Sequence, residues 1–172
     1  MTLLYAFSNP WGTNISHLTA IALAKAVPKD IKNKINFQLI PSYPQPFFRK
    51  YIQNNQYDLI IGLGDGMKFL QTIKIETRAI NSYCHQSINP LLPIYLDLSL
   101  PPVDNFDSRQ FSIGTNMGSY NCNWIAFQTQ YVINTKYPKT KHLFLHLPPR
   151  ASAITLATNL ISFFHANRLL SV

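Results

Sequence analysis

The stretch YDLIIGLGDG, residues 57–66, decides the fold class of this chain. Its apolar run has no alternation with polar residues, which is typical of a strand covered on both faces, as in a parallel sheet between helices. The run leads into three closely spaced glycines, Gly62, Gly64 and Gly66. No Gly-Lys-Ser/Thr follows these glycines, so they do not form a phosphate-binding loop of the P-loop type. The sequence therefore predicts a buried strand at 57–63 that ends in a glycine loop.

Strand and helix patterns alternate on both sides of this segment. We predict further strands at 2–7, 35–40, 73–81, 92–98, 110–114 and 141–147, and helices at 16–26, 46–53, 120–132 and 151–170. This order predicts a three-layer α/β/α sandwich with a mostly parallel mixed sheet, of the phosphorylase/hydrolase-like type, formed by residues 1–172 as a single domain. The proline-rich segment 82–107 is expected to be the loop over a site.

Composition narrows the possible functions. The 172 residues are 47% hydrophobic, which suits one core, and no apolar run approaches the roughly 20 residues of a membrane span. The N-terminus lacks a signal-peptide pattern, so we expect a cytoplasmic protein that does not bind membranes. The net charge is +8, but the basic residues are scattered and no nucleic-acid-binding motif is present. We therefore expect no nucleic-acid partner.

Cys122 is the first candidate for chemistry, because it lies at the start of a predicted helix, where unpaired amides and the helix dipole favour a thiolate. A buried structural cysteine is the alternative. The second cysteine, Cys84, lies in the proline-rich segment without a matched motif, and we interpret it as structural. A chain of this size needs no disulfide, so both are expected to be free thiols.

His146 and Glu76 are candidate partners of Cys122. His146 follows Cys122 by 24 residues and ends a predicted strand, so one helix, one turn and one strand can bring it back beside the helix start. Glu76 lies on an alternating strand from which it can orient the imidazole. Taken singly, His146 can be structural, and Glu76 can be an exposed carboxylate paired with Arg78 or Lys74.

Four segments together resemble the signature stretches of the pyroglutamyl peptidase family, in the family's order. They are AFSNPWG (6–12), IETRAIN (75–81), GSYNCN (118–123) and FLHLP (144–148). The resemblance implies a cysteine peptidase in which Cys122 is the nucleophile, His146 the general base and acid, and Glu76 the residue that orients it. It implies that neither a metal nor an organic cofactor is needed. It also implies that the substrate is a peptide or a small amide.

The resemblance also implies a pocket for the pyroglutamyl ring. Its predicted lining consists of Phe7, Trp11, Asn14, Leu63, Tyr120 and Asn121. Aromatic rings suit a flat lactam, and the Asn14 amide corresponds to the group that binds the lactam carbonyl in the family. The three aromatic residues can equally belong to the core.

Departures from the family pattern concentrate near this pocket. Met67 stands where the family has an arginine after the glycine loop, and Asn121 replaces an apolar residue before the cysteine. Loops that build oligomer contacts in the family are abbreviated here, so a homo-oligomer is possible without being implied. The departures leave two alternatives to pyroglutamyl peptidase activity: a catalytically degenerate binding protein of the same fold, and a thiol hydrolase of another small amide.

Overall fold

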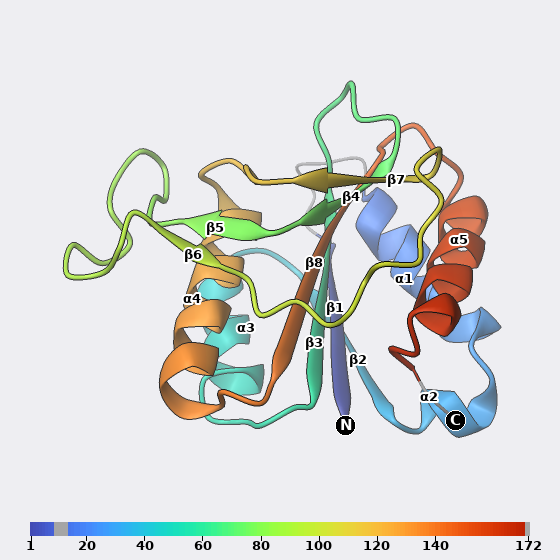
Figure 1. Cartoon of the computed structure of the whole chain (residues 1–172), viewed down its shortest axis with the longest axis horizontal. Coiled ribbons are helices and arrows are strands. Elements are labelled where there is room, and N and C mark those ends of the chain that lie inside the picture. The colour runs from blue at the N-terminus through green and yellow to red at the C-terminus, as the bar shows by residue number, and fades with distance from the viewer. Residues whose placement is uncertain (9–13, 171–172) are drawn as a thin grey trace.

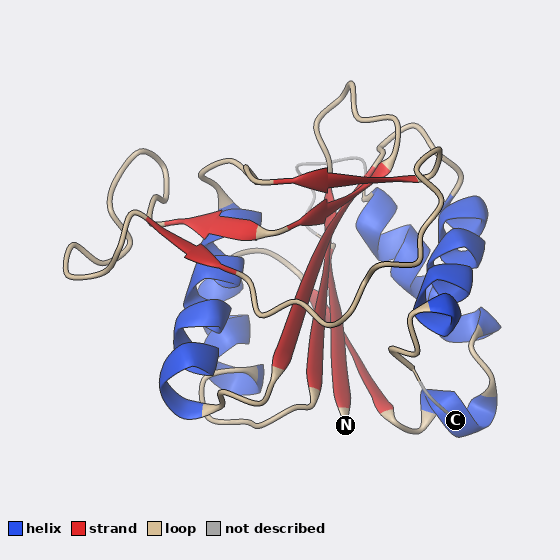
Figure 2. Ribbon diagram, in the orientation of Figure 1, coloured by secondary structure: helices blue, strands red, loops and turns tan. Residues whose placement is uncertain are grey.

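The structure is a computed structural model that describes residues 1–8 and 14–170. A six-stranded sheet lies between two pairs of helices, with a small two-stranded sheet projecting from one side (Figures 1 and 2). The predicted α/β/α class with a mostly parallel mixed sheet is therefore confirmed.

The main sheet has the order β2-β1-β3-β8-β4-β7. Its strands are β1 (Thr2–Phe7), β2 (Ile35–Ile40), β3 (Leu59–Asp65), β4 (Ile73–Glu76), β7 (Phe111–Gly114) and β8 (Lys141–Leu147). Strands β2, β1, β3 and β8 are mutually parallel, whereas β4 is antiparallel to β8 and parallel to β7. The second sheet pairs β5 (Arg78–Ile80) with β6 (Tyr95–Asp97) in antiparallel fashion.

The helices are α1 (Ile15–Ala26), α2 (Lys29–Lys32), α3 (Pro44–Tyr51), α4 (Asn121–Lys136) and α5 (Ala153–Ala166). Helices α1 and α5 cover one face of the main sheet, and α3 and α4 cover the other (Figure 1). Alternate residues of the central strands serve the two cores: Leu63 and Leu145 face α1 and α5, whereas Tyr5 and Phe144 face α3 and α4. Burial on both faces explains why the central strands lack polar alternation.

The predicted strand 73–81 is two strands, because the chain changes partners at Thr77. The Thr77 N–H donates to the Gly114 carbonyl at 2.8 Å, which continues the pairing of β4 with β7. The Thr77 carbonyl accepts from Leu98 N–H at 2.8 Å, on the side of the small sheet. Thr77 therefore lies where the chain leaves the main sheet for the β5–β6 pair.

Other boundaries also differ from those expected. The last helix ends at Ala166 rather than 170, the strand at 92–98 shortens to β6, and the four-residue α2 was not predicted. Residues 82–94 form an arm that extends beyond the β5–β6 pair (Figure 1). Within the described chain, no helix is both long enough and apolar enough to cross a membrane.

Candidate active site

The clearest polar contact near the carboxyl end of β8 joins Glu76 and His146. Glu76 Oε1 lies 2.7 Å from His146 Nδ1. The Glu76 side chain is fully buried, and the His146 side chain is almost fully buried. The antiparallel register of β4 and β8 brings these two residues together from positions 70 residues apart. Because an ionised carboxylate only accepts hydrogen bonds, Nδ1 carries the proton and Nε2 is left with a lone pair.

Cys122 approaches His146 from helix α4, which covers the face of the sheet toward which Gly64 points. It is the second residue of α4, and its Sγ would lie 2.8 Å from a Cβ added at Gly64. His146 Cδ2 would lie 3.1 Å from the same point. The missing side chain of Gly64 thus leaves a space that both the thiol and the imidazole border. The structure brings Glu76, His146 and Cys122 together in one place.

The thiol is not pre-ionised, contrary to what its place at a helix start suggests. Burial, followed by the negative charges of Asp65 and Glu76, raises the pKa of Cys122 to about 12. Desolvation and two carboxylates disfavour the thiolate more than the helix terminus favours it. Cys122 is therefore a neutral thiol at rest, and a base must take its proton when it reacts.

A cavity of about 760 Å³ opens above these residues. His146 and Cys122 lie in its wall together with Phe7, Asn14 and Lys74. Residues from the turn after β3 and from the approach to α4 complete the wall. Exposed apolar side chains surround it, since Met67 is 77%, Phe69 79% and Tyr120 64% exposed. An apolar mouth over a cysteine–histidine pair suits an organic substrate with one reactive carbonyl.

Asp65 adds an unexpected negative charge to this cavity. Its Oδ1 accepts from the Ser16 backbone N–H at 2.9 Å and lies 2.6 Å from Ser16 Oγ, near the start of α1. A carboxylate there satisfies an amide that the helix itself leaves unpaired and interacts favourably with the helix dipole. Asp65 therefore fixes the end of β3 to α1 beside the candidate nucleophile.

The predicted pocket residues fall into three groups. Phe7, Asn14, Tyr120 and Asn121 line the cavity. Leu63 does not, because it is fully buried in the core under α1 and α5. Its place on β3 turns its side chain away from α4. Trp11 lies outside the described residues.

Asn121 is already partnered within the protein. Its Oδ1 accepts from the Tyr83 hydroxyl at 3.0 Å, so the amide oxygen has a partner within the protein. The predicted loop over the site is also wrong: no residue of 82–107 lines the cavity, because β5 and β6 carry this segment aside. Residues 66–70 and 116–120 border it instead.

Cys84, expected to be structural, has an exposed side chain, and both cysteines are free. Its contribution is made by the backbone, because its N–H donates to the Ser119 carbonyl at 2.7 Å. This bond ties the arm to the segment that leads into α4.

Met67, the departure from the family pattern noted beside the predicted pocket, lines the cavity. Sequence reasoning missed several other lining residues, namely Asp65, Phe69, Leu70, Lys74, Asn116 and Met117. Lys74 had a detectable signal, because it precedes Glu76 by two residues on an alternating strand and so shares its face. The others lie in turns whose approach to the cavity depends on the fold.

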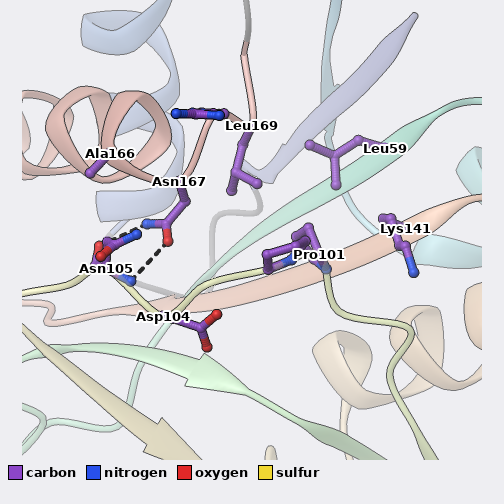
Figure 3. Close-up of a pocket in the computed structure, with 10 residues that line it drawn as sticks. Leu59, Pro101, Asp104, Asn105, Lys141, Ala166, Asn167 and Leu169 are labelled. Atoms are coloured by element: carbon purple, nitrogen blue, oxygen red, sulfur yellow. Dashed lines mark hydrogen bonds between the residues drawn. The ribbon is translucent and has the colours of Figure 1, made fainter.

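A second cavity, of about 530 Å³, lies at the opposite ends of the strands (Figure 3). It is bordered by Leu59 and Lys141, which begin β3 and β8, and by the end of α5. Asn167 there exchanges hydrogen bonds with the Asn105 backbone at 2.8 and 3.0 Å. None of its lining residues is a cysteine or histidine, and nowhere in 1–8 or 14–170 do three or more His, Cys, Asp or Glu side chains gather as metal ligands.

The fold and the grouped side chains define an α/β/α domain. A buried glutamate and a histidine lie near the ends of β4 and β8, and a cysteine lies beside them at the start of α4. No family model matches the chain, and no curated protein does. Solved structures do match. Pyroglutamyl peptidase I from Bacillus amyloliquefaciens superposes with a TM-score of 0.78 at 17% identity, over 98% of this chain and 96% of that one.

Two pyrrolidone carboxyl peptidases agree with this match. A mutant of the enzyme from the hyperthermophile Pyrococcus furiosus gives a TM-score of 0.75 at 16% identity, over the full length of both chains. The enzyme from Fervidobacterium islandicum gives 0.74 at 18% identity, over 98% of this chain and 97% of that one. The chain therefore has the fold of the pyroglutamyl peptidases, as the four sequence segments predicted.

Proposed function

We propose that this chain is a cysteine peptidase that removes an N-terminal pyroglutamyl group, or a related small acyl group, from an amide. The observation that carries the proposal is the 2.7 Å contact between buried Glu76 and His146, with Cys122 and His146 both packed against Gly64. A glutamate that orients an imidazole beside a thiol is the arrangement of a Cys-His-acid hydrolase. Likeness of fold to pyroglutamyl peptidases supports the choice of substrate.

In the proposed reaction, His146 Nε2 removes the Cys122 proton as Sγ attacks the carbonyl carbon of the substrate. Because the resting thiol is neutral, proton transfer accompanies attack rather than preceding it. His146 then returns this proton to the departing amine as the C–N bond breaks, which leaves a thioester on Cys122. A water molecule, deprotonated by His146, hydrolyses the thioester and restores the thiol.

Two features support the charged stages of this reaction. Glu76 stabilises the imidazolium that forms when His146 holds the proton. The first amides of α4 have no side-chain cap among the described residues, so they are available to bind the oxyanion. Loss of one such donor typically lowers the rate about 10²- to 10³-fold.

The test is hydrolysis of a pyroglutamyl fluorogenic amide. We expect turnover by the wild type and by Cys84→Ser, which removes only the exposed thiol, and loss of turnover in Cys122→Ala and His146→Ala. Equal inertness of wild type and Cys122→Ala, or equal activity, would reject the proposal. An alanyl or prolyl amide as second substrate distinguishes a pyroglutamyl group from a different small acyl group.

A catalytically degenerate binding protein is the second candidate, and the raised pKa of Cys122 is the observation that favours it. A cysteine held neutral only by burial would react slowly with iodoacetamide near pH 7, and His146→Ala would not change the rate. If His146 activates the thiol, the wild type reacts faster than His146→Ala. Mass spectrometry of Cys122 in the Cys84→Ser background measures both rates.

A further inference from the structure

Lys74 makes two contacts at the candidate active site that the proposed reaction does not use. Its Nζ lies 2.7 Å from Glu76 Oε1, the same oxygen that receives the His146 Nδ1 hydrogen. The same ammonium donates to the Asn116 carbonyl at 3.0 Å. Lys74 is also the residue opposite His146 in the pairing of β4 with β8.

These contacts belong to a packed site and not to a surface ion pair. The Lys74 side chain is 19% exposed, and Glu76 is fully buried. Gly114 of the neighbouring strand β7 leaves room for the lysine stem, since a Cβ there would lie 2.7 Å from Lys74 Cδ and 2.9 Å from Glu76 Oε2. The lysine and the carboxylate therefore share a space that only glycine provides.

We propose that Lys74 is a positioning residue of this site, which holds Glu76 ionised and aimed at His146 and anchors the segment before α4 through Asn116. This inference rests on the proposed hydrolase function and deepens it, because it adds a fourth residue to the Cys-His-Glu group. Asn116 and Met117 line the cavity, so a single ammonium links the carboxylate to the cavity wall.

The charge of Lys74 has a predictable effect on the protonation of its neighbours. The charged and titratable groups that interact with His146 and Cys122 are Glu76 and Lys74 on β4, Asp65 on β3 and Tyr5 on β1. The charge of Glu76 is one cause of the raised pKa of Cys122, and the Lys74 ammonium lies against that carboxylate. Removing the cation leaves the Glu76 charge unbalanced and raises the pKa of Cys122 further, so the reactivity of the thiol at a given pH falls.

Three variants in the Cys84→Ser background separate charge from contact. Lys74→Met removes the charge and both polar contacts, Lys74→Gln removes the charge but keeps a donor, and Lys74→Arg keeps the charge. Lys139→Met, on an exposed turn, is the matched control for loss of one lysine. The measurement is the rate of iodoacetamide alkylation of Cys122 at fixed pH values between 7 and 9. This range lies below the Cys122 pKa of about 12, so the rate is proportional to the thiolate fraction. The measurement needs no substrate.

We expect the alkylation rate at a given pH to fall about tenfold in Lys74→Met and Lys74→Gln, and to stay near the wild-type value in Lys74→Arg and Lys139→Met. An unchanged rate in the neutral variants overturns the proposal. If Lys74→Met does not fold by circular dichroism, Lys74→Gln decides the question. The same change would also lower kcat/KM at a given pH for any amide that is hydrolysed.

The alkylation result is independent of the proposed substrate. If the neutral variants are alkylated more slowly and the protein cleaves none of the pyroglutamyl, alanyl and prolyl amides, the role of Lys74 is supported and the peptidase function is rejected. Cleavage with an unchanged alkylation rate in the neutral variants supports the function and rejects the role of Lys74.

Discussion

At the scale of single residues, two glycines of β3 have different roles. One is packed in the core, and the other lies at the candidate active site. Gly62 and Gly64 both face α4, because side chains two positions apart on a strand share a face. A Cβ at Gly62 would lie 2.6 Å from Phe144 Cδ2 and Tyr5 Oη, within the core. A Cβ at Gly64 would lie against Cys122 Sγ and His146 Cδ2.

We therefore expect Gly64→Ala to lower kcat/KM at least tenfold by separating thiol and imidazole, because small displacements of reacting groups are costly. Gly62→Ala should instead lower the free energy of unfolding by about 1–3 kcal/mol through overpacking. Urea unfolding and amide hydrolysis, measured on both variants, compare the two effects. Similar activity losses in both variants would contradict this division.

Asp65 is a second residue with a separable effect. Its charge is the second cause, after burial, of the raised pKa of Cys122. Asp65→Asn keeps an oxygen for the Ser16 amide but removes the charge, so the pKa of Cys122 should fall. We expect the alkylation rate of Cys122 at pH 8 to rise about three- to tenfold. Asp104→Asn, at an exposed residue of the other cavity, is the control, and a slower rate in Asp65→Asn would contradict the prediction.

At the scale of elements, one buried side chain joins α4 to the small sheet. Asn123, the residue after Cys122, accepts from Ile80 N–H at 2.7 Å and donates to the Ile80 and Ser82 carbonyls at 2.8 and 2.7 Å. These three bonds fix the first turn of α4, and so Cys122, relative to β5. The IETRAIN and GSYNCN segments are thus in direct contact.

Asn123→Ala should lower the free energy of unfolding by about 2–3 kcal/mol, because it leaves partly buried backbone groups of Ile80 and Ser82 without the partner that Asn123 provides. Gln128→Ala, on a less buried part of the same helix, should change it by less than about 0.5 kcal/mol. Urea denaturation followed by circular dichroism measures both. Equal stabilities of the two variants would show that the link is not needed.

At the scale of the whole molecule, a buried histidine far from the thiol makes stability depend on pH. His142 is fully buried near the start of β8, and its Nδ1 lies 3.3 Å from Gln130 Oε1. Burial lowers the pKa of His142 to about 3. Below the ordinary histidine pKa of about 6.5, the unfolded chain binds a proton that the folded chain cannot hold. Stability from this group is therefore complete above pH 6.5 and is lost as pH falls toward 3.

The expected loss between pH 7.5 and pH 5 is about 2 kcal/mol from His142 alone. His142→Gln removes the titrating group, so its unfolding free energy should change less over this interval than that of the wild type. Urea unfolding at the two pH values gives the difference. Parallel changes in wild type and variant would assign the acid sensitivity to other groups.

The fold could be predicted wherever local sequence settles the structure. Strands β1, β2 and β8 have the predicted bounds, because each is a short run of strand-forming residues bounded by turn residues. Thr77 could not be predicted as a break, since nothing local to it changes; its partners Gly114 and Leu98 come from distant segments. The prediction that 82–107 covers the site is wrong for the same reason, because the pairing of β5 with β6 places this segment.

The sequence by itself determined the α/β/α class and, through four ordered segments, singled out Cys122, His146 and Glu76. Periodicity and the order of motifs are read directly from the sequence, so they can be recognised without knowledge of the fold. Only the tertiary structure decided which charges surround these residues. Strand register and the missing side chain of Gly64 bring Lys74, Asp65 and the thiol into one site, and desolvation there makes Cys122 a neutral thiol despite its place at a helix start.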